Sequence, residues 1–181
     1  MERQELKIPI ERVAVLIGTK GAVKKHLEKR LQIHIEVDSK EGDVLVEGED
    51  SVTVYETTQV IKAIGRGFHP DVAQRLLDKE YMMELLNVQE YIGNSKKHMR
   101  RVKGRVIGRE GRAREMIEDM TDTSISVYGK TVGIIGRIEW VSVARQAMEM
   151  LLQGAPHGNV YKWLERKKRD MMRREFEEKD L

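Results

Sequence analysis

The feature that most limits how this chain can fold is an internal repeat. The segment IGTKG at residues 17–21 returns as IGREG at residues 107–111, an offset of 90 positions. The same offset places Leu27 on Ile117 and aligns further apolar residues. Self-similarity at a fixed spacing indicates one structural unit used twice. Because the chain has 181 residues, it has room for two small domains of the same fold.

Each copy has the same expected order of elements: strand, helix, loop, helix, strand, strand, helix. Apolar residues alternate with polar ones in the strands and recur at helical intervals in the helices. In the first copy the elements fall at residues 6–10, 13–17, 23–31, 33–37, 44–46 and 52–64. In the second copy a strand at 83–88 precedes the helix that leads into Gly108, and strands at 125–128 and 132–135 precede a helix at 138–152. Residues 91–100 are an insertion that the first copy lacks.

These patterns predict a fold of the α/β (α+β) class in four segments. We expect a first domain at residues 1–69, a linking helix at 70–80, a second domain at 81–155 and a charged C-terminal helix at 156–181. Apolar residues are sparse in that last helix. Packing against the domains is its favoured interpretation, and a surface for a partner is the alternative.

Positive charge is concentrated in the second copy. Residues 95–114 hold nine basic residues and one acidic residue, a net charge of +8, whereas the whole chain carries +3. Residues 5–25 of the first copy carry +3. Several cations on one surface gain free energy by releasing the counterions condensed on a polyanion. The cluster therefore predicts that the second copy dominates nucleic-acid binding, although a solvated helical face gives the same pattern.

The Gly-x-x-Gly element has a physical reason. Two glycines between helices allow a tight turn without a Cβ in the way, so a nucleic-acid backbone can approach closely. The following helix then presents free N–H groups and a partial positive charge to a phosphate. A single element of this kind indicates no more than a turn between helices. Two copies in the same context indicate a binding loop.

Composition excludes several other classes of protein. The chain has no Cys, and its five His residues show no metal-ligand spacing, which argues against thiolate metal sites and Cys nucleophiles. It has no GxxxxGK phosphate loop. We therefore expect no enzyme, no cofactor and no metal. Because no apolar run approaches the roughly 20 residues of a membrane span and the N-terminus has no apolar signal core, we expect a cytoplasmic protein without a membrane partner.

The two loops and their flanking residues resemble the signature of the type I KH domain. The matching segments are VLIGTKG at residues 15–21 and RVIGREG at residues 105–111. The resemblance implies two tandem βααββα domains, each a three-stranded sheet packed on three helices. Each would clamp about four nucleotides of single-stranded RNA or DNA, with the loop against the backbone. The residues that would line or underlie the two grooves, or form plain core instead, are Ile17, Leu27, Ile35, Ile107, Ile117 and Ile125.

Further features resemble a narrower group. Lys24 and Arg114 stand where Ile or Val is usual in KH domains, and a cation at a groove edge suits RNA contact. Together with the segments IGRGF at 64–68 and GAPHGNVY at 154–161, they are similar to the two-KH proteins of small-ribosomal-subunit assembly, the Dim/Pno type related to Krr. The intact glycine pair of the first copy favours the archaeal form.

This resemblance implies an RNA-binding protein that acts by positioning. Its RNA would be the 3′ region of small-subunit rRNA, and its partners would include the PIN-domain endonuclease that matures that end and other assembly or translation factors. The first domain is left with two interpretations, RNA binding and protein binding. The alternatives for the whole chain are a protein-binding scaffold of a ribosomal or translation complex and the KH subunit of an RNA-degrading complex.

The expected RNA-binding residues are the loop positions and the side chains beside them. In the second domain they are Arg100, Arg101, Lys103, Arg105, Ile107, Gly108, Arg109, Glu110, Gly111, Arg112 and Arg114. In the first domain they are Gly18, Thr19, Lys20, Gly21 and Lys24.

Overall fold

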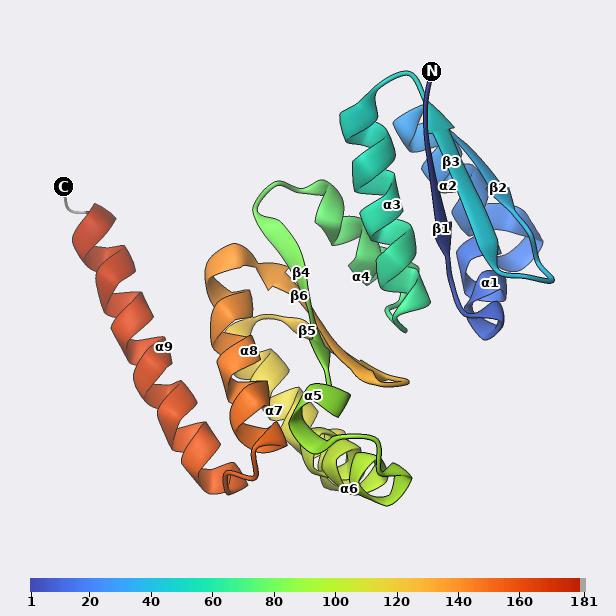
Figure 1. The fold of residues 1–181 in the computed structure, drawn as a ribbon. Coiled ribbons are helices and arrows are strands. Elements are labelled where there is room, and N and C mark those ends of the chain that lie inside the picture. Colours follow the sequence, from blue (N-terminus) through green and yellow to red (C-terminus); the bar gives the residue numbers. More distant parts are fainter. Residues whose placement is uncertain (180–181) are drawn as a thin grey trace. The chain divides into compact units, whose positions relative to one another are not determined.

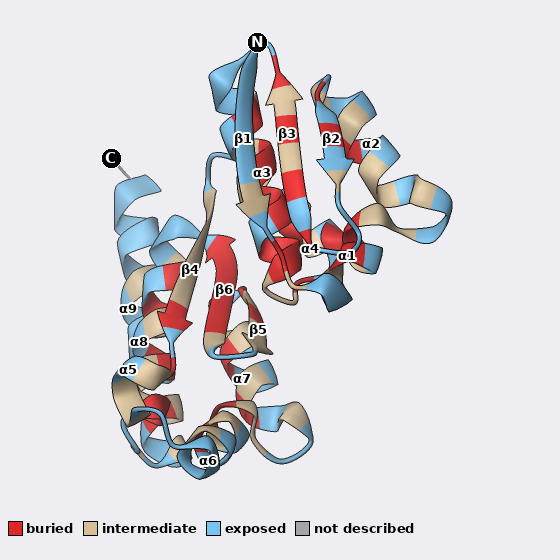
Figure 2. Ribbon diagram, turned by 45° about the vertical axis from the view of Figure 1, so that its right-hand side comes forward, coloured by how far each residue is buried: buried red, intermediate tan, exposed pale blue. Residues whose placement is uncertain are grey.

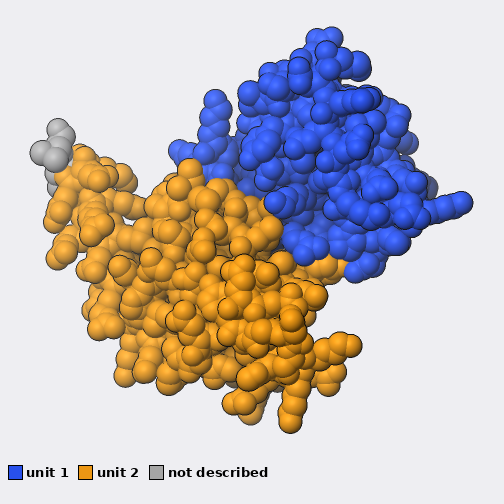
Figure 3. Space-filling view, viewed as in Figure 1, with its two compact units in different colours: residues 1–81 blue, residues 82–181 orange. Residues whose placement is uncertain are grey.

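The structure of the protein is a computed structural model that describes residues 1–179. The chain forms two compact units, divided between Tyr81 and Met82 (Figure 3). Unit 1 contains the first copy of the repeat and unit 2 contains the second.

Unit 1 is a three-stranded antiparallel sheet with helices against one face (Figure 1). The strand order is β1-β3-β2, so the last strand in sequence lies in the middle. The elements are β1 (Glu2–Lys7), α1 (Ile10–Ile17), η1 (Thr19–Gly21), α2 (Ala22–Leu31), β2 (His34–Val37), β3 (Asp43–Gly48), α3 (Ser51–Gly65), α4 (Pro70–Ala73) and η2 (Gln74–Leu77).

Alternation along the strands creates the core of unit 1. Successive side chains of a strand point to opposite faces of the sheet. Ile35 pairs with Val46 across β2 and β3, and both side chains are buried. Val44 of β3, Leu16 of α1 and Leu27 of α2 are also at most 1% exposed, and the buried residues lie on the facing sides of the sheet and helices (Figure 2). The sheet therefore holds α1 and α2, and with them the loop between these helices.

Unit 2 repeats this order of elements. Its sheet has the order β4-β6-β5, again with the last strand in the middle. The elements are β4 (Tyr81–Asn87), α5 (Gln89–Ile92), α6 (Lys96–Ile107), η3 (Arg109–Gly111), α7 (Arg112–Thr121), β5 (Ser124–Tyr128), β6 (Thr131–Arg137), α8 (Ile138–Leu152) and α9 (His157–Lys179). The expected α+β fold class, with two three-stranded sheets each packed on helices and a charged C-terminal helix, is confirmed.

The two units differ at the insertion. Residues 91–100 are mostly helical, because they complete α5 and supply the first turns of α6. Ser95 caps α6, its hydroxyl accepting a hydrogen bond from the His98 N–H at 3.3 Å. As a result α6 has 12 residues, whereas α1 has 8.

The segment expected to be a single linking helix at residues 70–80 is shorter than predicted. It consists of α4, which begins at Pro70, and the 3-10 helix η2. The backbone becomes extended at Asp78, which ends the helical segment.

The C-terminal helix α9 packs on unit 2 through its first half. Val160 and Leu164 are buried in the core of this unit, and Trp163 and Met171 pack against it. The favoured interpretation of this helix is therefore confirmed for its first half. Beyond Met171, the residues of α9 up to 179 are exposed.

Candidate nucleic-acid interface

Both glycine loops have the same backbone conformation. The first glycine of each loop, Gly18 or Gly108, has φ/ψ angles of 75°/172° or 77°/172°. The third position, Lys20 or Glu110, has a positive φ of 54° or 55°. The two loops therefore share their backbone conformation as well as their sequence pattern.

The first glycine of the second loop is required by packing as well as by conformation. A Cβ on Gly108 would lie 2.6 Å from the Cβ and 2.7 Å from the backbone N of Ala113 in α7. The dihedral angles also fall in a region that L-residues avoid. Gly108 thus lets α6 and α7 meet closely, which makes residues 109 and 110 protrude as an exposed turn.

The second loop presents cations to solvent. Arg109 is exposed in the loop, and Arg112 is exposed in the first turn of α7. The Arg112 Nη2 atom lies 3.1 Å from the Glu110 carboxylate, but both side chains are more than 70% exposed. A surface pair of this kind is worth about 0–1 kcal/mol, so Arg112 can exchange it for a phosphate. The N–H groups at the start of α7 add a partial positive charge at the same place.

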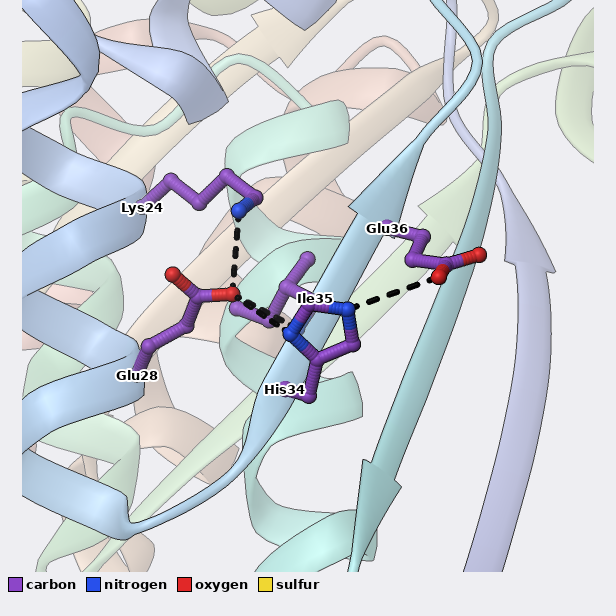
Figure 4. A network of polar contacts seen from close by, with 5 residues as sticks. All are labelled: Lys24, Glu28, His34, Ile35 and Glu36. Atoms are coloured by element: carbon purple, nitrogen blue, oxygen red, sulfur yellow. Dashed lines mark hydrogen bonds and ion pairs between the residues drawn. The ribbon is translucent and has the colours of Figure 1, made fainter.

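The cation expected at the groove edge of unit 1 is held by an internal network. The Lys24 Nζ atom lies 2.9 Å from the Glu28 carboxylate one helical turn later (Figure 4). The same carboxylate oxygen accepts a hydrogen bond from the Ile35 N–H at 2.9 Å, which ties α2 to β2. His34 lies between Glu28 and Glu36, with each ring nitrogen 3.4 Å from a carboxylate oxygen. Burial acts to raise the pKa of Glu28, but the bonds from Ile35 and Lys24 bring this pKa below its ordinary value.

Unit 2 has the glutamate of this network with a weaker ion pair, but Ser124 and Ser126 stand at the positions of His34 and Glu36. Glu118 accepts a hydrogen bond from the Ile125 N–H at 2.7 Å, and the Arg114 Nε atom lies 3.8 Å from the other carboxylate oxygen. Burial raises the pKa of Glu118 above its ordinary value, and the Ile125 bond and the more distant Arg114 do not offset it. Arg114 is 38% exposed and Lys24 27%, so the second groove edge keeps the more available cation.

Comparison with known proteins identifies the family. A model of the KH domain matches residues 3–66, and a model of the second KH domain of Pno1, described as a eukaryotic type KH domain of type I, matches residues 82–169. A KH domain-containing protein of Methanocaldococcus jannaschii is 46% identical over 95% of this chain and 77% of its own length. The chain belongs to the Pno1/Dim2 family of two-KH-domain proteins. The resemblance of the sequence to this family is confirmed.

Other members of the family are similar over most of the chain. The pre-rRNA-processing protein pno1 of Emericella nidulans is 26% identical over 89% of this chain, which spans 65% of that relative's length. The structure of an a/eIF2alpha-aDim2p-rRNA complex from Pyrococcus horikoshii contains a chain with a TM-score of 0.86 and 45% identity, covering 93% of this chain and 95% of that one. A protein of unknown function from Aeropyrum pernix has a TM-score of 0.91 and 40% identity, with coverage of 98% and 96%.

The basic residues of α6 in the second KH domain divide into two groups. Lys96, Lys97, Arg100 and Arg101 are exposed. Lys103 donates to the Gly129 carbonyl at 2.9 Å, and Arg105 donates through Nη2 to the Ala155 carbonyl at 2.6 Å. His157 Nε2 lies 2.8 Å from the Arg105 carbonyl oxygen. Arg105 thus joins α6 to the start of α9 within the domain.

The apolar residues expected at the two grooves lie mainly in the cores. Of the six, Leu27, Ile35, Ile117 and Ile125 are buried, the last at 5% exposure and the others at 0%. Ile17 and Ile107, which immediately precede the loops, are half-buried. Ile17 and Ile107 therefore keep part of their side-chain surface accessible, whereas the other four belong to the cores of the two units.

One part of the interface did not follow from the sequence. Lys130, in the turn between β5 and β6, lines the same groove as Lys103 and Ile107. Its position in the two-residue turn of the second copy was the sequence signal that could have indicated this role.

In residues 1–179 no cluster of His, Cys, Asp and Glu could hold a metal ion. Within the same range, no helix has the length and apolar character needed to span a membrane.

Proposed function

We propose that this protein binds single-stranded RNA through its second KH domain and holds the 3′ region of small-subunit rRNA during ribosome assembly. The observation that carries the proposal is the second loop. Arg109 and Arg112 are exposed there, within the segment 95–114 that has a net charge of +8. KH domains bind single strands with this loop against the backbone. The names of relatives support the RNA class, since they include pre-rRNA-processing proteins and a Dim2p in a complex with rRNA.

The mechanism is positioning. Backbone N–H groups and arginine side chains hold phosphates, which fixes the register of the strand without reading its sequence. The half-buried Ile107 lies next to the loop, where it would contact a base of the bound strand. A strand held in this way can be presented to the PIN-domain endonuclease that matures the 3′ end, and the complex would act in the cytoplasm.

The first KH domain is proposed to serve mainly a protein partner. Its groove-edge Lys24 is bound to Glu28, and Glu36 and His34 lie beside that pair. Acidic groups at this edge disfavour a phosphate backbone through like-charge repulsion. The complex that contains a/eIF2alpha together with a related Dim2p makes a translation factor a suitable class of partner.

Binding assays with two RNAs test the proposed function. The full chain is titrated with a single-stranded RNA from the 3′ end of small-subunit rRNA and with a scrambled RNA of equal length, over a series of salt concentrations. We expect the affinity for both RNAs to fall with salt, because cations on the protein release counterions from the RNA. The preference for the rRNA sequence persists at high salt. Equal affinity for both RNAs at every salt concentration contradicts the proposal and favours the protein-binding scaffold.

A further inference from the structure

One side of the C-terminal helix α9 carries a row of exposed cations, which we call the α9 basic face. Its members are Lys162, Arg166, Arg169 and Arg173. Residues three and four apart are neighbours on one side of a helix, so these side chains form a continuous row about 16 Å long. The buried residues of the helix, Val160 and Leu164, anchor it to unit 2. The row is therefore displayed on a helix that is held in place.

The charge of this face is not neutralised by neighbouring groups. Residues 162–174 hold seven basic and two acidic residues, a net charge of +5. Within residues 1–179, no ion pair or side-chain hydrogen bond holds any of the four cations of the row. The groove-edge cations Lys24 and Arg114, by contrast, each lie beside a glutamate. The row also lies before the last turn of α9, where the helix dipole would stabilise cations. Helix stability therefore gives no reason for the row, whereas a polyanion does.

A hollow of about 500 Å³ lies beside the row, where α9 meets Met150 of α8. Three of its four charged lining residues are the cations Lys162, Arg166 and Arg169, and the fourth is Glu165. The side chain of Asn159 adds an amide that can donate to an anion. The surface is thus concave where its positive charge is concentrated, which lets several cations surround one anionic group.

The same face lacks a free platform for a base. Proteins that hold single strands stack successive bases on aromatic side chains. Trp163, the aromatic residue in the lining, is half-buried and packs against the core of unit 2. The Lys167 Nζ atom lies 5.7 Å from the centroid of its ring. A straight row of cations without a stacking surface suits the regular phosphate backbone of helical RNA, which proteins recognise by shape and phosphate contacts.

We propose that the α9 basic face binds the phosphate backbone of a double-helical RNA segment. The inference rests on the proposed function and deepens it, because it adds a second class of RNA structure to the single strand held at the loop. The contacts are to phosphates, so they fix the position of the RNA and do not read its sequence. The second KH domain and α9 then hold two parts of one folded RNA.

Two double variants of α9 form a matched pair. Arg166→Ala/Arg169→Ala removes two cations of the row, and Lys167→Ala/Arg174→Ala removes two exposed cations of the same helix that do not line the hollow. The change in net charge is the same. The full chain is titrated with a blunt-ended RNA duplex of arbitrary sequence over a series of salt concentrations. We expect the first variant to weaken duplex binding about ten-fold and the second about two-fold. The first also lowers the slope of log affinity against log salt by about 2.

The single-stranded rRNA 3′-end RNA serves as the second probe. Its affinity should change less than about two-fold in either double variant, because single strands bind at the loop. The inference is overturned if the wild-type chain does not bind the duplex or if the two double variants weaken duplex binding equally. An equal loss for both RNAs in Arg166→Ala/Arg169→Ala overturns it as well. Arg109→Asp distinguishes failure of the proposed function, because single-strand binding that survives this change refutes that function and leaves the duplex comparison unaffected.

Discussion

Substitution of the first glycine in the second loop tests whether the structure explains the loop. Gly108→Ala places a Cβ 2.6 Å from the Ala113 Cβ and 2.7 Å from its backbone N. A residue other than glycine at φ +77° and ψ 172° also costs about 1–3 kcal/mol, and overpacking adds about 1–3 kcal/mol. We expect a loss of about 3 kcal/mol or more in the free energy of unfolding. For a unit of this size that corresponds to a Tm about 12–24 °C lower.

The second glycine of the same loop is the control. Gly111 also has a positive φ, 78°, but the nearest atom to an added Cβ is the end of the flexible Glu115 side chain at 3.8 Å. Gly111→Ala therefore bears only the cost of the left-handed conformation, about 1–2 kcal/mol. Thermal unfolding followed by tryptophan fluorescence reports on unit 2, because both tryptophans, Trp140 and Trp163, pack against its core. Equal losses from Gly108→Ala and Gly111→Ala would refute the packing argument.

Two further predictions concern the paired glutamates and the centre of α6. Because the pKa of Glu28 is lowered, its contribution to stability is present above the ordinary glutamate pKa and is lost as the pH falls through the lowered value. The pKa of Glu118 is raised, so its contribution is present below the ordinary value and is lost as the pH rises through the raised one. In an NMR titration, the amide shift of Ile125 should change at higher pH than that of Ile35; the reverse order contradicts these assignments. Gly104→Ala should raise the free energy of unfolding by about 0.5–1 kcal/mol, because Ala is favoured over Gly within a helix and no atom lies within 4 Å of the added Cβ. Urea unfolding followed by tryptophan fluorescence measures this change. A loss of stability would show that this helix position is not open.

Most of the fold could be predicted from the internal repeat. An offset of 90 residues aligned both loops, and the structure gives them the same dihedral angles. The same offset also aligns Glu28 with Glu118, each one helical turn after Lys24 or Arg114. That spacing of a cation and a glutamate is a signal for the two ion pairs that hold these cations, although the same cations were expected to contact RNA.

Other parts of the site could not be read from periodicity. Arg105 donates to Ala155, a carbonyl 50 residues away, and no local pattern encodes such a partner. The insertion at residues 91–100 has no counterpart in the first copy. The sequence comparison therefore predicted neither α5 nor the groove beside it, and both follow from the structure. Gln89 and Asn94 are isolated polar residues in the sequence, and their mutual hydrogen bond depends on the turn between α5 and α6.

The central claim is that RNA binds at the loop of the second KH domain, and one charge-matched comparison tests it most directly. Arg109→Asp and Lys20→Asp each replace an exposed cation in one of the two loops by a carboxylate. The affinity of both variants for the rRNA 3′-end RNA is measured at the same salt concentration. We predict that Arg109→Asp weakens binding far more than Lys20→Asp. Equal losses, or a larger loss from Lys20→Asp, would contradict it.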